Sequence, residues 1–195
     1  MIATDLRQQY DKQGYVIARQ AVDAGLAAET ADHVHWLLKK HPDTRPEQLH
    51  HNLLVDDPFM HRLAGDDRLL DIVEQFIGPD IALFAAHYIA KRPYDGQAVL
   101  WHQDGTYWPL EPMEVTTIWL AATDSTVENG CMRVMPRSHI APDADHEETY
   151  DPKNLLGRGQ RVSTQLSLGG NKNLINIQFT EQKKEPSRHL NLLCY

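Results

Sequence analysis

The sequence contains little cysteine and no long apolar run. Its two cysteines, Cys131 and Cys194, fit neither a disulfide framework nor the paired spacing of a metal-binding motif. No stretch of about 18 apolar residues, the length of a membrane-spanning helix, occurs in it. The N-terminus also lacks the apolar core of a secretory signal. We therefore expect a soluble cytoplasmic protein in a reducing compartment, with no membrane partner.

An excess of positive charge is also missing. The 195 residues include 19 Lys and Arg against 27 Asp and Glu, which gives a net charge of −8. Such a chain has no global field for holding nucleic acid, so we expect no nucleic-acid partner. An anionic ligand would need cations placed locally. The length and the apolar fraction of 42% suit one globular domain with a sizeable core.

The hydrophobic period changes near residue 80. Before it, apolar residues recur at helical spacing, and acidic or Pro-containing starts and Gly stops bound the segments. Helices are expected over residues 4–12, 23–40 and 66–77, with a short one starting at Asp57-Pro58. After residue 80 the pattern favours strands, expected over residues 81–90, 97–102, 115–122, 132–135 and 160–168. Asn129-Gly130 is typical of a hairpin turn with two positive-φ positions.

The sequence His102-Gln103-Asp104 follows one of these strands. Residues two apart on an extended strand point to the same face, so the imidazole and the carboxylate can converge on one metal ion. They would form two thirds of the 2-His-1-carboxylate triad of non-haem Fe(II) oxygenases. Taken alone, a His-x-Asp pair is a weak signal that also arises by chance or for structural reasons.

Further motifs surround this pair in a fixed order. They are Trp101-His102-Gln103-Asp104, Tyr107-Trp108-Pro109, Thr117-Ile118-Trp119-Leu120-Ala121, Glu128-Asn129-Gly130-Cys131 and Pro136-Arg137-Ser138-His139. On these motifs, residues 100–139 resemble the phytanoyl-CoA dioxygenase family of Fe(II)/2-oxoglutarate-dependent oxygenases. Arg137 departs from the family pattern, in which Gly is common at that position. The resemblance extends more loosely back to the N-terminus.

The resemblance implies both a fold and an activity. The fold would be mainly β with N-terminal helices, a double-stranded β-helix or cupin-like jelly roll. The single domain would comprise a helical part (1–80), a jelly-roll core (81–168) and a divergent tail (169–195). The activity would be hydroxylation of a small organic substrate with O2, forming succinate and CO2 from 2-oxoglutarate. Fe(II) would be held by His102 and Asp104.

The resemblance also assigns roles to other side chains. Trp119 matches a position that packs on the cosubstrate, and Thr117 shares its strand face; His87 matches a position beside 2-oxoglutarate. Tyr107 and Trp108 would form a substrate wall that excludes water. Structural alternatives stay open: a satisfied core histidine for His87, a packing role for Trp119, and a lid for the aromatic loop. For Ser138-His139 a hydrogen-bonded turn is favoured over a metal ligand.

The C-terminal part does not follow the family pattern. The family's second metal-binding His and its 2-oxoglutarate-binding Arg are not recognisable, and His189 is the only histidine after the last expected strand. Composition shifts at Gly169-Gly170 toward Asn and Lys, as in a foreign tail. One hypothesis is therefore a truncated, non-catalytic member: an incomplete barrel that binds metal weakly or not at all and self-associates through open edges. In the other, a divergent ending brings His189 into the site. A small-molecule binding module without metal is a third, and nothing selects the substrate.

Overall fold

The computed structural model describes residues 3–104, 115–127, 129–140, 146–149, 153–155, 159–162 and 193–194. The chain divides into two compact units, each made of three stretches of sequence. The first unit comprises Met1–Ala18, Gln97–Thr116 and Met132–Lys183; the second comprises Arg19–Gly96, Thr117–Cys131 and Lys184–Tyr195. Within the described residues, no helix is long and apolar enough to cross a membrane.

The second unit contains most of the helices. They are α2 (Ala24–Lys40), α3 (His51–Leu54), α4 (Pro58–Ala64) and α5 (Asp67–Ile77), with the short 3-10 helix η1 (Pro46–Gln48). An aspartate precedes α2, α4 and α5, and in each case its carboxylate accepts a backbone N–H of the first turn. These caps satisfy donors that the helix itself leaves unpaired. The helices predicted at 23–40, from Asp57 and at 66–77 are confirmed within a residue or two.

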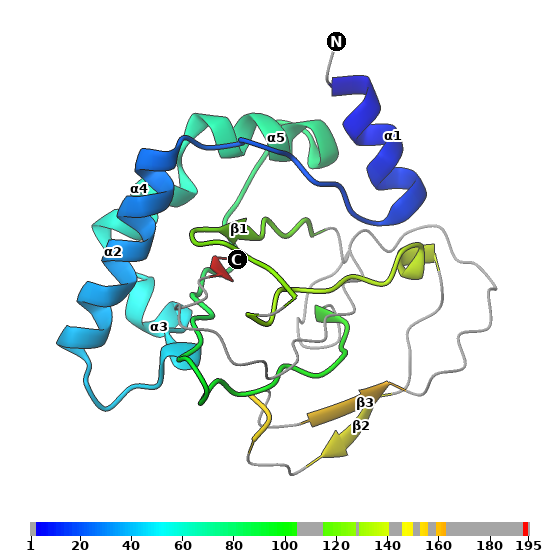
Figure 1. Cartoon of the computed structure of the whole chain (residues 1–195). Coiled ribbons are helices and arrows are strands. Elements are labelled where there is room, and N and C mark those ends of the chain that lie inside the picture. The colour runs from blue at the N-terminus through cyan, green and yellow to red at the C-terminus, as the bar shows by residue number, and fades with distance from the viewer. Residues whose placement is uncertain are drawn as a thin grey trace. The chain divides into compact units, whose positions relative to one another are not determined.

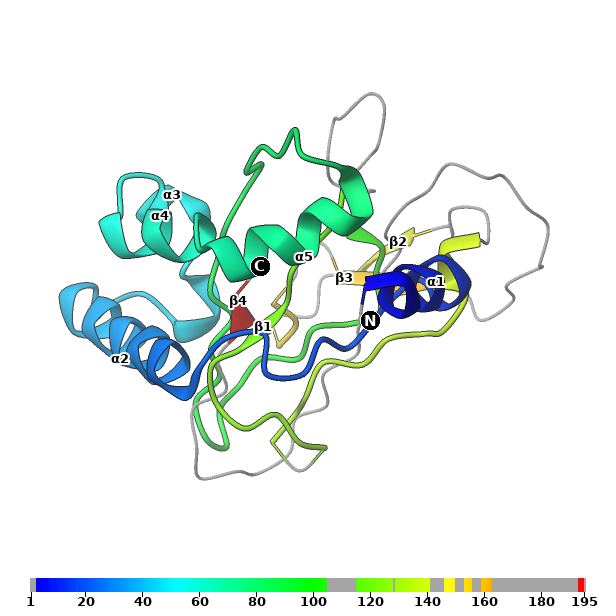
Figure 2. The same ribbon diagram turned by 90° about the horizontal axis from the view of Figure 1, so that it is seen from above.

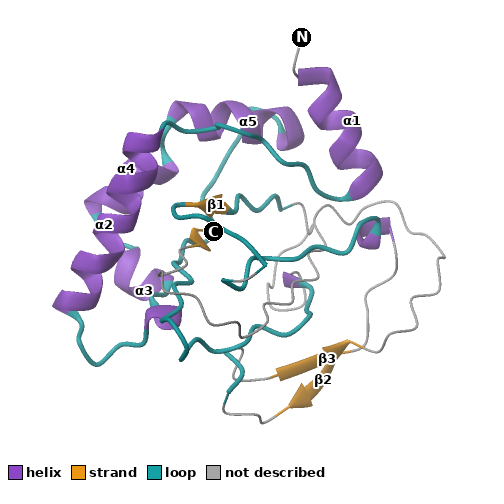
Figure 3. Cartoon of the chain, viewed as in Figure 1, coloured by secondary structure: helices purple, strands orange, loops and turns teal. Residues whose placement is uncertain are grey.

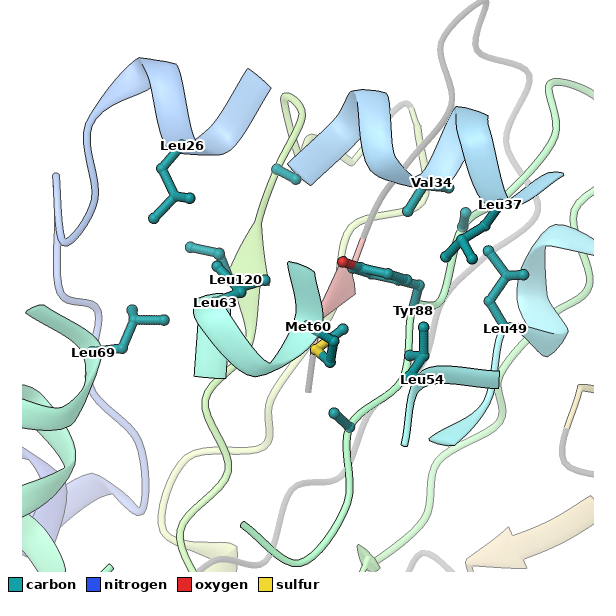
Figure 4. Packing of buried hydrophobic residues seen from close by; sticks show 13 residues of the cluster. Leu26, Val34, Leu37, Leu49, Leu54, Met60, Leu63, Leu69, Tyr88 and Leu120 are labelled. Atoms are coloured by element: carbon teal, nitrogen blue, oxygen red, sulfur yellow. The ribbon is translucent and has the colours of Figure 1, made fainter. Parts of the chain in front are cut away.

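The core of the second unit lies between these helices and two extended segments. From α2, Leu26, Val34 and Leu37 are buried at helical spacing. Tyr88 is fully buried among side chains of α2 and α4 and of residues 49–54 (Figure 4). The extended segments bury every second residue in the same cluster: Ala86, Tyr88 and Ala90 from one, Leu120 and Ala122 from the other. The helices lie along one side of the strand pair formed by β1 (Leu120–Ala121) and β4 (Leu193–Cys194) (Figures 1 and 2).

The first unit is built around α1 (Ala3–Gln13) and the 3-10 turn η3 (Ser138–Ile140). Gly14 ends α1 with φ +81°, as expected for a helix stop, and its N–H donates to the Tyr10 carbonyl at 2.7 Å. The Arg137 N–H donates to the Gln13 carbonyl at 2.7 Å, which fastens the helix end to the turn. The strands β2 (His146–Thr149) and β3 (Gly159–Val162) form an antiparallel pair in the same unit.

The strand predictions agree with the structure less well. Among the described residues, β1 pairs with β4 and β2 with β3, and isolated bridges join Leu49 to Tyr88 and Ala98 to Asn154. Most of the segments at 81–90, 97–102, 115–122 and 132–135 are therefore irregular rather than strands (Figure 3). The apolar alternation was read correctly as burial, but a strand also needs a hydrogen-bonding neighbour, which a linear pattern does not specify. The strand expected at 160–168 is present as β3, and residues 163–168 lie outside the described part.

The turn at Asn129-Gly130 forms, but its predicted backbone was wrong at one position. Gly130 has φ +81°, whereas Asn129 is not among the positive-φ residues. Asn129 acts through its side chain instead: Oδ1 accepts the Thr126 N–H at 2.8 Å and Nδ2 donates to the Asp124 carbonyl at 2.7 Å. An Asn side chain that imitates a backbone turn in this way removes the need for a second left-handed residue.

Candidate functional site

The structure brings His102 and Asp104 together in the first unit. Nε2 of His102 lies 3.0 Å from Oδ1 of Asp104, and their side chains are only 6% and 12% exposed. Both residues stand at the end of the segment that begins at Gln97, as the two-residue spacing implied. An imidazole nitrogen and a carboxylate oxygen therefore converge in a nearly dry environment.

The second ring nitrogen of His102 has a backbone partner. Nδ1 lies 2.7 Å from the Leu100 carbonyl oxygen, which can only accept, so Nδ1 carries the proton. The lone pair of the neutral ring is then on Nε2, the atom that faces Asp104. Metal-binding histidines are oriented in this way, by donating their other N–H to a carbonyl or carboxylate.

Burial of His102 and the charge of Asp104 shift the pKa of His102 in opposite directions. Burial lowers the pKa of His102, while the hydrogen bond and charge of Asp104, together with the Leu100 carbonyl, raise it. The net effect raises the pKa, so without a metal the pair tends toward an imidazolium held by a carboxylate. A cation other than a proton would meet the same two donors, one nitrogen and one oxygen, which suit Fe(II).

The donor set in the described part of the chain is incomplete for a facial triad. No group of three His, Cys, Asp or Glu side chains that could hold a metal ion occurs among the described residues. His189, the candidate third ligand, and the predicted substrate wall of Tyr107 and Trp108 lie outside those residues. The described residues thus fit two of the three positions of such a centre.

The predicted cosubstrate residues Thr117 and Trp119 belong to the second unit, and both are half-buried. Leu120 and Ala122 point into the core and Ile118 packs against it, so Thr117 and Trp119 face the other way. Nε1 of Trp119 is buried and finds no hydrogen-bond partner among the residues that the structure describes. A buried indole N–H normally finds an acceptor, so this one is a candidate donor to a ligand.

His87 is also in the second unit, on the face opposite the core residues Ala86 and Tyr88. It is half-buried, and its ring meets that of His50 edge to face, with centroids 6.3 Å apart. Sequence reasoning offered two roles for His87, a place near the cosubstrate and a satisfied core histidine. The contact between His50 and His87 joins residues distant in sequence, and no local pattern could have revealed it.

Ser138 and His139 form the hydrogen-bonded turn that was favoured for them. The Ser138 hydroxyl donates to the Met135 carbonyl at 2.8 Å. Nε2 of His139 lies 2.9 Å from the Asp11 carbonyl in α1, which it meets as a donor. This imidazole therefore serves helix packing in the first unit.

Comparison with known proteins places this chain in a family. A family model described as "Phytanoyl-CoA dioxygenase (PhyH)" matches residues 10–170. A Dictyostelium discoideum homologue of phytanoyl-CoA dioxygenase domain-containing protein 1 is 45% identical over 83 residues, which cover 43% of this chain and 30% of that protein. The Caenorhabditis elegans homologue is 29% identical over 98 residues, 50% of this chain and 34% of its own length. The chain thus spans about a third of these curated relatives.

Solved structures show the fold class. The non-heme monooxygenase ThoJ matches with a TM-score of 0.73 and 17% identity, over 97% of this chain and 75% of that chain. The epimerase SnoN, solved with Fe3+, alpha ketoglutarate and nogalamycin RO, matches with a TM-score of 0.72 and 22% identity, over 98% and 81%. These proteins have the cupin-like jelly-roll fold, and this chain shares that class of fold. Within the class it is a member of the phytanoyl-CoA dioxygenase family.

Proposed function

We propose that this chain is a non-haem Fe(II)/2-oxoglutarate-dependent dioxygenase that hydroxylates a small organic substrate. The observation that carries the proposal is the pair His102–Asp104, with Nε2 and Oδ1 3.0 Å apart and Nδ1 tied to the Leu100 carbonyl. This arrangement prepares the ring for a metal, because its hydrogen bond to the carbonyl already orients it before any metal binds. The named relatives and the solved structures support the same cofactors: an EctD structure from S. alaskensis contains 2-oxoglutarate, and SnoN contains iron.

The protein's own contribution is to hold ligands, orient them and keep the site dry. His102 and Asp104 would hold Fe(II), and the burial of His102, which is 4% exposed, limits the access of water. Trp119, Thr117 and His87 would contribute to a pocket for the cosubstrate. When bound, iron and 2-oxoglutarate would supply activation of O2, with release of succinate and CO2 and hydroxylation of a substrate C–H bond. Tyr107 and Trp108 are proposed as the substrate wall.

A second candidate is a truncated, non-catalytic member of the family. Two observations favour it: the family match ends at residue 170, and the described residues contain no third metal ligand near the pair. Such a chain would bind metal weakly or not at all and would self-associate through unpaired edges of an incomplete barrel.

One titration separates the two candidates. The purified chain is titrated anaerobically with Fe(II) and 2-oxoglutarate while the weak visible charge-transfer band of the chelated cosubstrate is recorded. The dioxygenase proposal expects the band in the wild-type chain and its loss in His102→Ala. A folded wild-type chain that develops no band would contradict the proposal and support the non-catalytic alternative.

A further inference from the structure

Tyr88 is a fully buried tyrosine whose hydroxyl is hydrogen-bonded to a histidine. Its side chain lies in the core of the second unit, among side chains of α2 and α4 (Figure 4). The hydroxyl oxygen lies 3.0 Å from Nδ1 of His33, and the two rings meet edge to face with their centroids 5.7 Å apart. Burying a hydroxyl costs free energy unless it is hydrogen-bonded, and here its partner is a ring that can also take a proton.

His33 is oriented to accept the proton of the phenol. Its Nε2 lies 3.2 Å from Oδ2 of Asp57, and both side chains are only 9% exposed. A carboxylate can only accept, so in the neutral ring Nε2 carries the proton and the lone pair of Nδ1 faces Tyr88. Burial holds the pKa of His33 below the ordinary 6.5, which keeps the ring neutral at neutral pH. An imidazolium formed by proton transfer from Tyr88 would be paired at once with the Asp57 carboxylate.

His33 also connects the buried tyrosine to the surface of the second unit. Trp36 lies one turn further along α2, and its ring stacks on that of His33 with centroids 5.5 Å apart and planes 19° apart. The indole is 48% exposed, whereas Tyr88 is 0% exposed. Two oxidisable rings, one at the surface and one in the core, therefore contact the same imidazole.

The charges around these rings favour Tyr88 over Trp36 as the place for an oxidised ring. Nζ of Lys40 lies 4.7 Å from the centroid of the Trp36 ring. A cation is attracted by the electrons of an aromatic face, so it opposes the removal of one of them. Oxidation of Tyr88 leaves a neutral ring once its proton has moved, and the new positive charge lies on His33. Asp57 affects the pKa of His33 more strongly than Lys40 does, so that charge is stabilised.

We propose that Tyr88, His33 and Asp57 form a redox site at which Tyr88 is oxidised by one electron through Trp36. A one-electron oxidant in solution takes an electron from the exposed indole. Tyr88 then gives an electron to the indole and passes its phenolic proton to Nδ1 of His33. The products are the restored Trp36, a neutral phenoxyl radical on Tyr88 and an imidazolium paired with Asp57. The inference is independent of the proposed function, because it uses no metal and neither of the proposed ligands.

The burial of Tyr88 gives its radical a long lifetime. Phenoxyl radicals in solution are lost chiefly when two of them couple, which requires rings that can meet. A ring that is 0% exposed cannot meet the ring of another chain. Tyr94, in the same unit, is 61% exposed and has no such protection. Persistence therefore distinguishes a radical on Tyr88 from one on an exposed tyrosine.

The test oxidises the purified chain with photogenerated tris(bipyridine)ruthenium(III), with a cobalt(III) pentaammine complex as the irreversible electron acceptor. Samples are frozen at increasing delays, and the tyrosyl radical is measured by electron paramagnetic resonance. The wild-type chain and the control Tyr94→Phe should both show a tyrosyl signal that outlasts the oxidant, and Tyr88→Phe should lose it. The absence of a persistent signal in the wild-type chain, or an equal signal in Tyr88→Phe, would overturn the inference.

His33→Gln distinguishes a proton acceptor from a simple hydrogen-bond partner. The amide can hydrogen-bond the phenol but cannot take its proton, so the Tyr88 radical should form about 100-fold more slowly or not at all, as expected for loss of a positioned base. His35→Gln, which removes an exposed imidazole from the same helix, should form it at the wild-type rate. A wild-type rate in His33→Gln would show that the hydroxyl serves packing alone. This comparison keeps Tyr88, so it decides the matter even if Tyr88→Phe does not fold.

Trp36→Phe tests the route to the surface. Phenylalanine keeps a ring beside His33 but is much harder to oxidise than tryptophan. The persistent radical should therefore form several-fold more slowly than in the wild-type chain, while its lifetime stays the same because the burial of Tyr88 is unchanged. An unchanged rate of formation would overturn the assignment of Trp36 as the point at which the oxidant acts.

Discussion

In the first unit, the His139 side chain lies so close to Gly14 that it leaves no room for a side chain at position 14. A Cβ on Gly14 would lie 2.7 Å from Cγ of His139 and closer still to Nδ1, inside any normal nonbonded contact. The glycine also has φ +81°, a conformation that L-residues rarely adopt. One position thus combines a backbone requirement with a steric one, and both serve the attachment of α1 to the turn at 136–140.

Gly14→Ala should lower the free energy of unfolding by about 2–6 kcal/mol, the sum of a positive-φ cost and an overpacking cost of about 1–3 kcal/mol each. Urea unfolding followed by circular dichroism measures the change. Gly78 provides a matched control, because it has φ +83° but no atom within 4 Å of its built Cβ. Gly78→Ala should show a backbone cost alone, about 1–3 kcal/mol. Equal losses in both variants would argue against the contact with His139.

The hydrogen bonds of His33 join three segments of the second unit. Nδ1 of His33 lies 3.0 Å from the Tyr88 hydroxyl, and Nε2 lies 3.2 Å from Oδ2 of Asp57. The neutral ring meets both partners if Nε2–H donates to the carboxylate and Nδ1 accepts from the phenol. The other oxygen of Asp57 caps α4 by accepting the Met60 N–H at 2.9 Å. One imidazole therefore links α2 to the start of α4 and to the buried tyrosine.

His33 should make stability depend on pH in the acid range. Burial lowers its pKa below the ordinary 6.5, more than Asp57 raises it; Lys40 lowers it further. The unfolded chain then binds more protons than the folded chain between the lowered pKa and 6.5, so stability is full above 6.5 and falls as pH falls through that window. Unfolding midpoints measured from pH 7.5 to 5 should show this slope.

His33→Gln should flatten that part of the pH profile, because an amide does not titrate there. His35→Gln is the matched control, since it removes an exposed imidazole from the same helix. If the two variants have the same pH profile as the wild-type chain, the linkage to His33 is wrong. Tyr88→Phe should cost about 1–2 kcal/mol at neutral pH, because it takes the donor away from a buried acceptor.

Local features of the chain were predictable from sequence. The helices followed from apolar spacing and from caps such as Asp23 and Asp66, all of which act within one or two turns. The convergence of His102 with Asp104 followed from the two-residue period of an extended segment. The family motifs between residues 100 and 139 then indicated the fold class and the chemistry.

Contacts between distant segments could not be predicted in this way. His33 meets Tyr88 across 55 positions, and the ring of His50 meets that of His87. The strand ladders expected from apolar alternation were largely wrong for the same reason, because alternation reports burial of one face but not the presence of a hydrogen-bonded neighbour. Sequence reasoning therefore anticipated that His102 and Asp104 lie together and missed the contact of His33 with Tyr88.

The side chain of Asn129 holds the turn at residues 124–130 through hydrogen bonds to the backbone, and its contribution to stability can be tested. Asn129 is 8% exposed and makes two hydrogen bonds to the chain that precedes it. Asn129→Ala should lower the free energy of unfolding by about 1–3 kcal/mol, since it leaves the Thr126 N–H and the Asp124 carbonyl without these partners. Asn129→Asp keeps the acceptor and loses the donor, so its free energy of unfolding should lie between those of Asn129→Ala and the wild-type chain. An alanine variant as stable as wild type would show that water replaces both bonds.

Substitution of the proposed ligands His102 and Asp104 should weaken metal binding. Loss of a group that hydrogen-bonds a metal-binding histidine costs about 10–100-fold in metal affinity, and loss of a direct ligand should cost no less. His102→Ala and Asp104→Ala should therefore each weaken Mn(II) binding by at least that factor, as measured by equilibrium dialysis. His139→Ala is the control, because its imidazole contacts α1 and is not proposed as a ligand. If the two ligand variants retain wild-type affinity, the metal binds elsewhere. If His139→Ala weakens binding as much as they do, the turn at 138–140 is part of the site after all, because loss of helix packing alone would reduce thermal stability without changing the affinity of the folded chain.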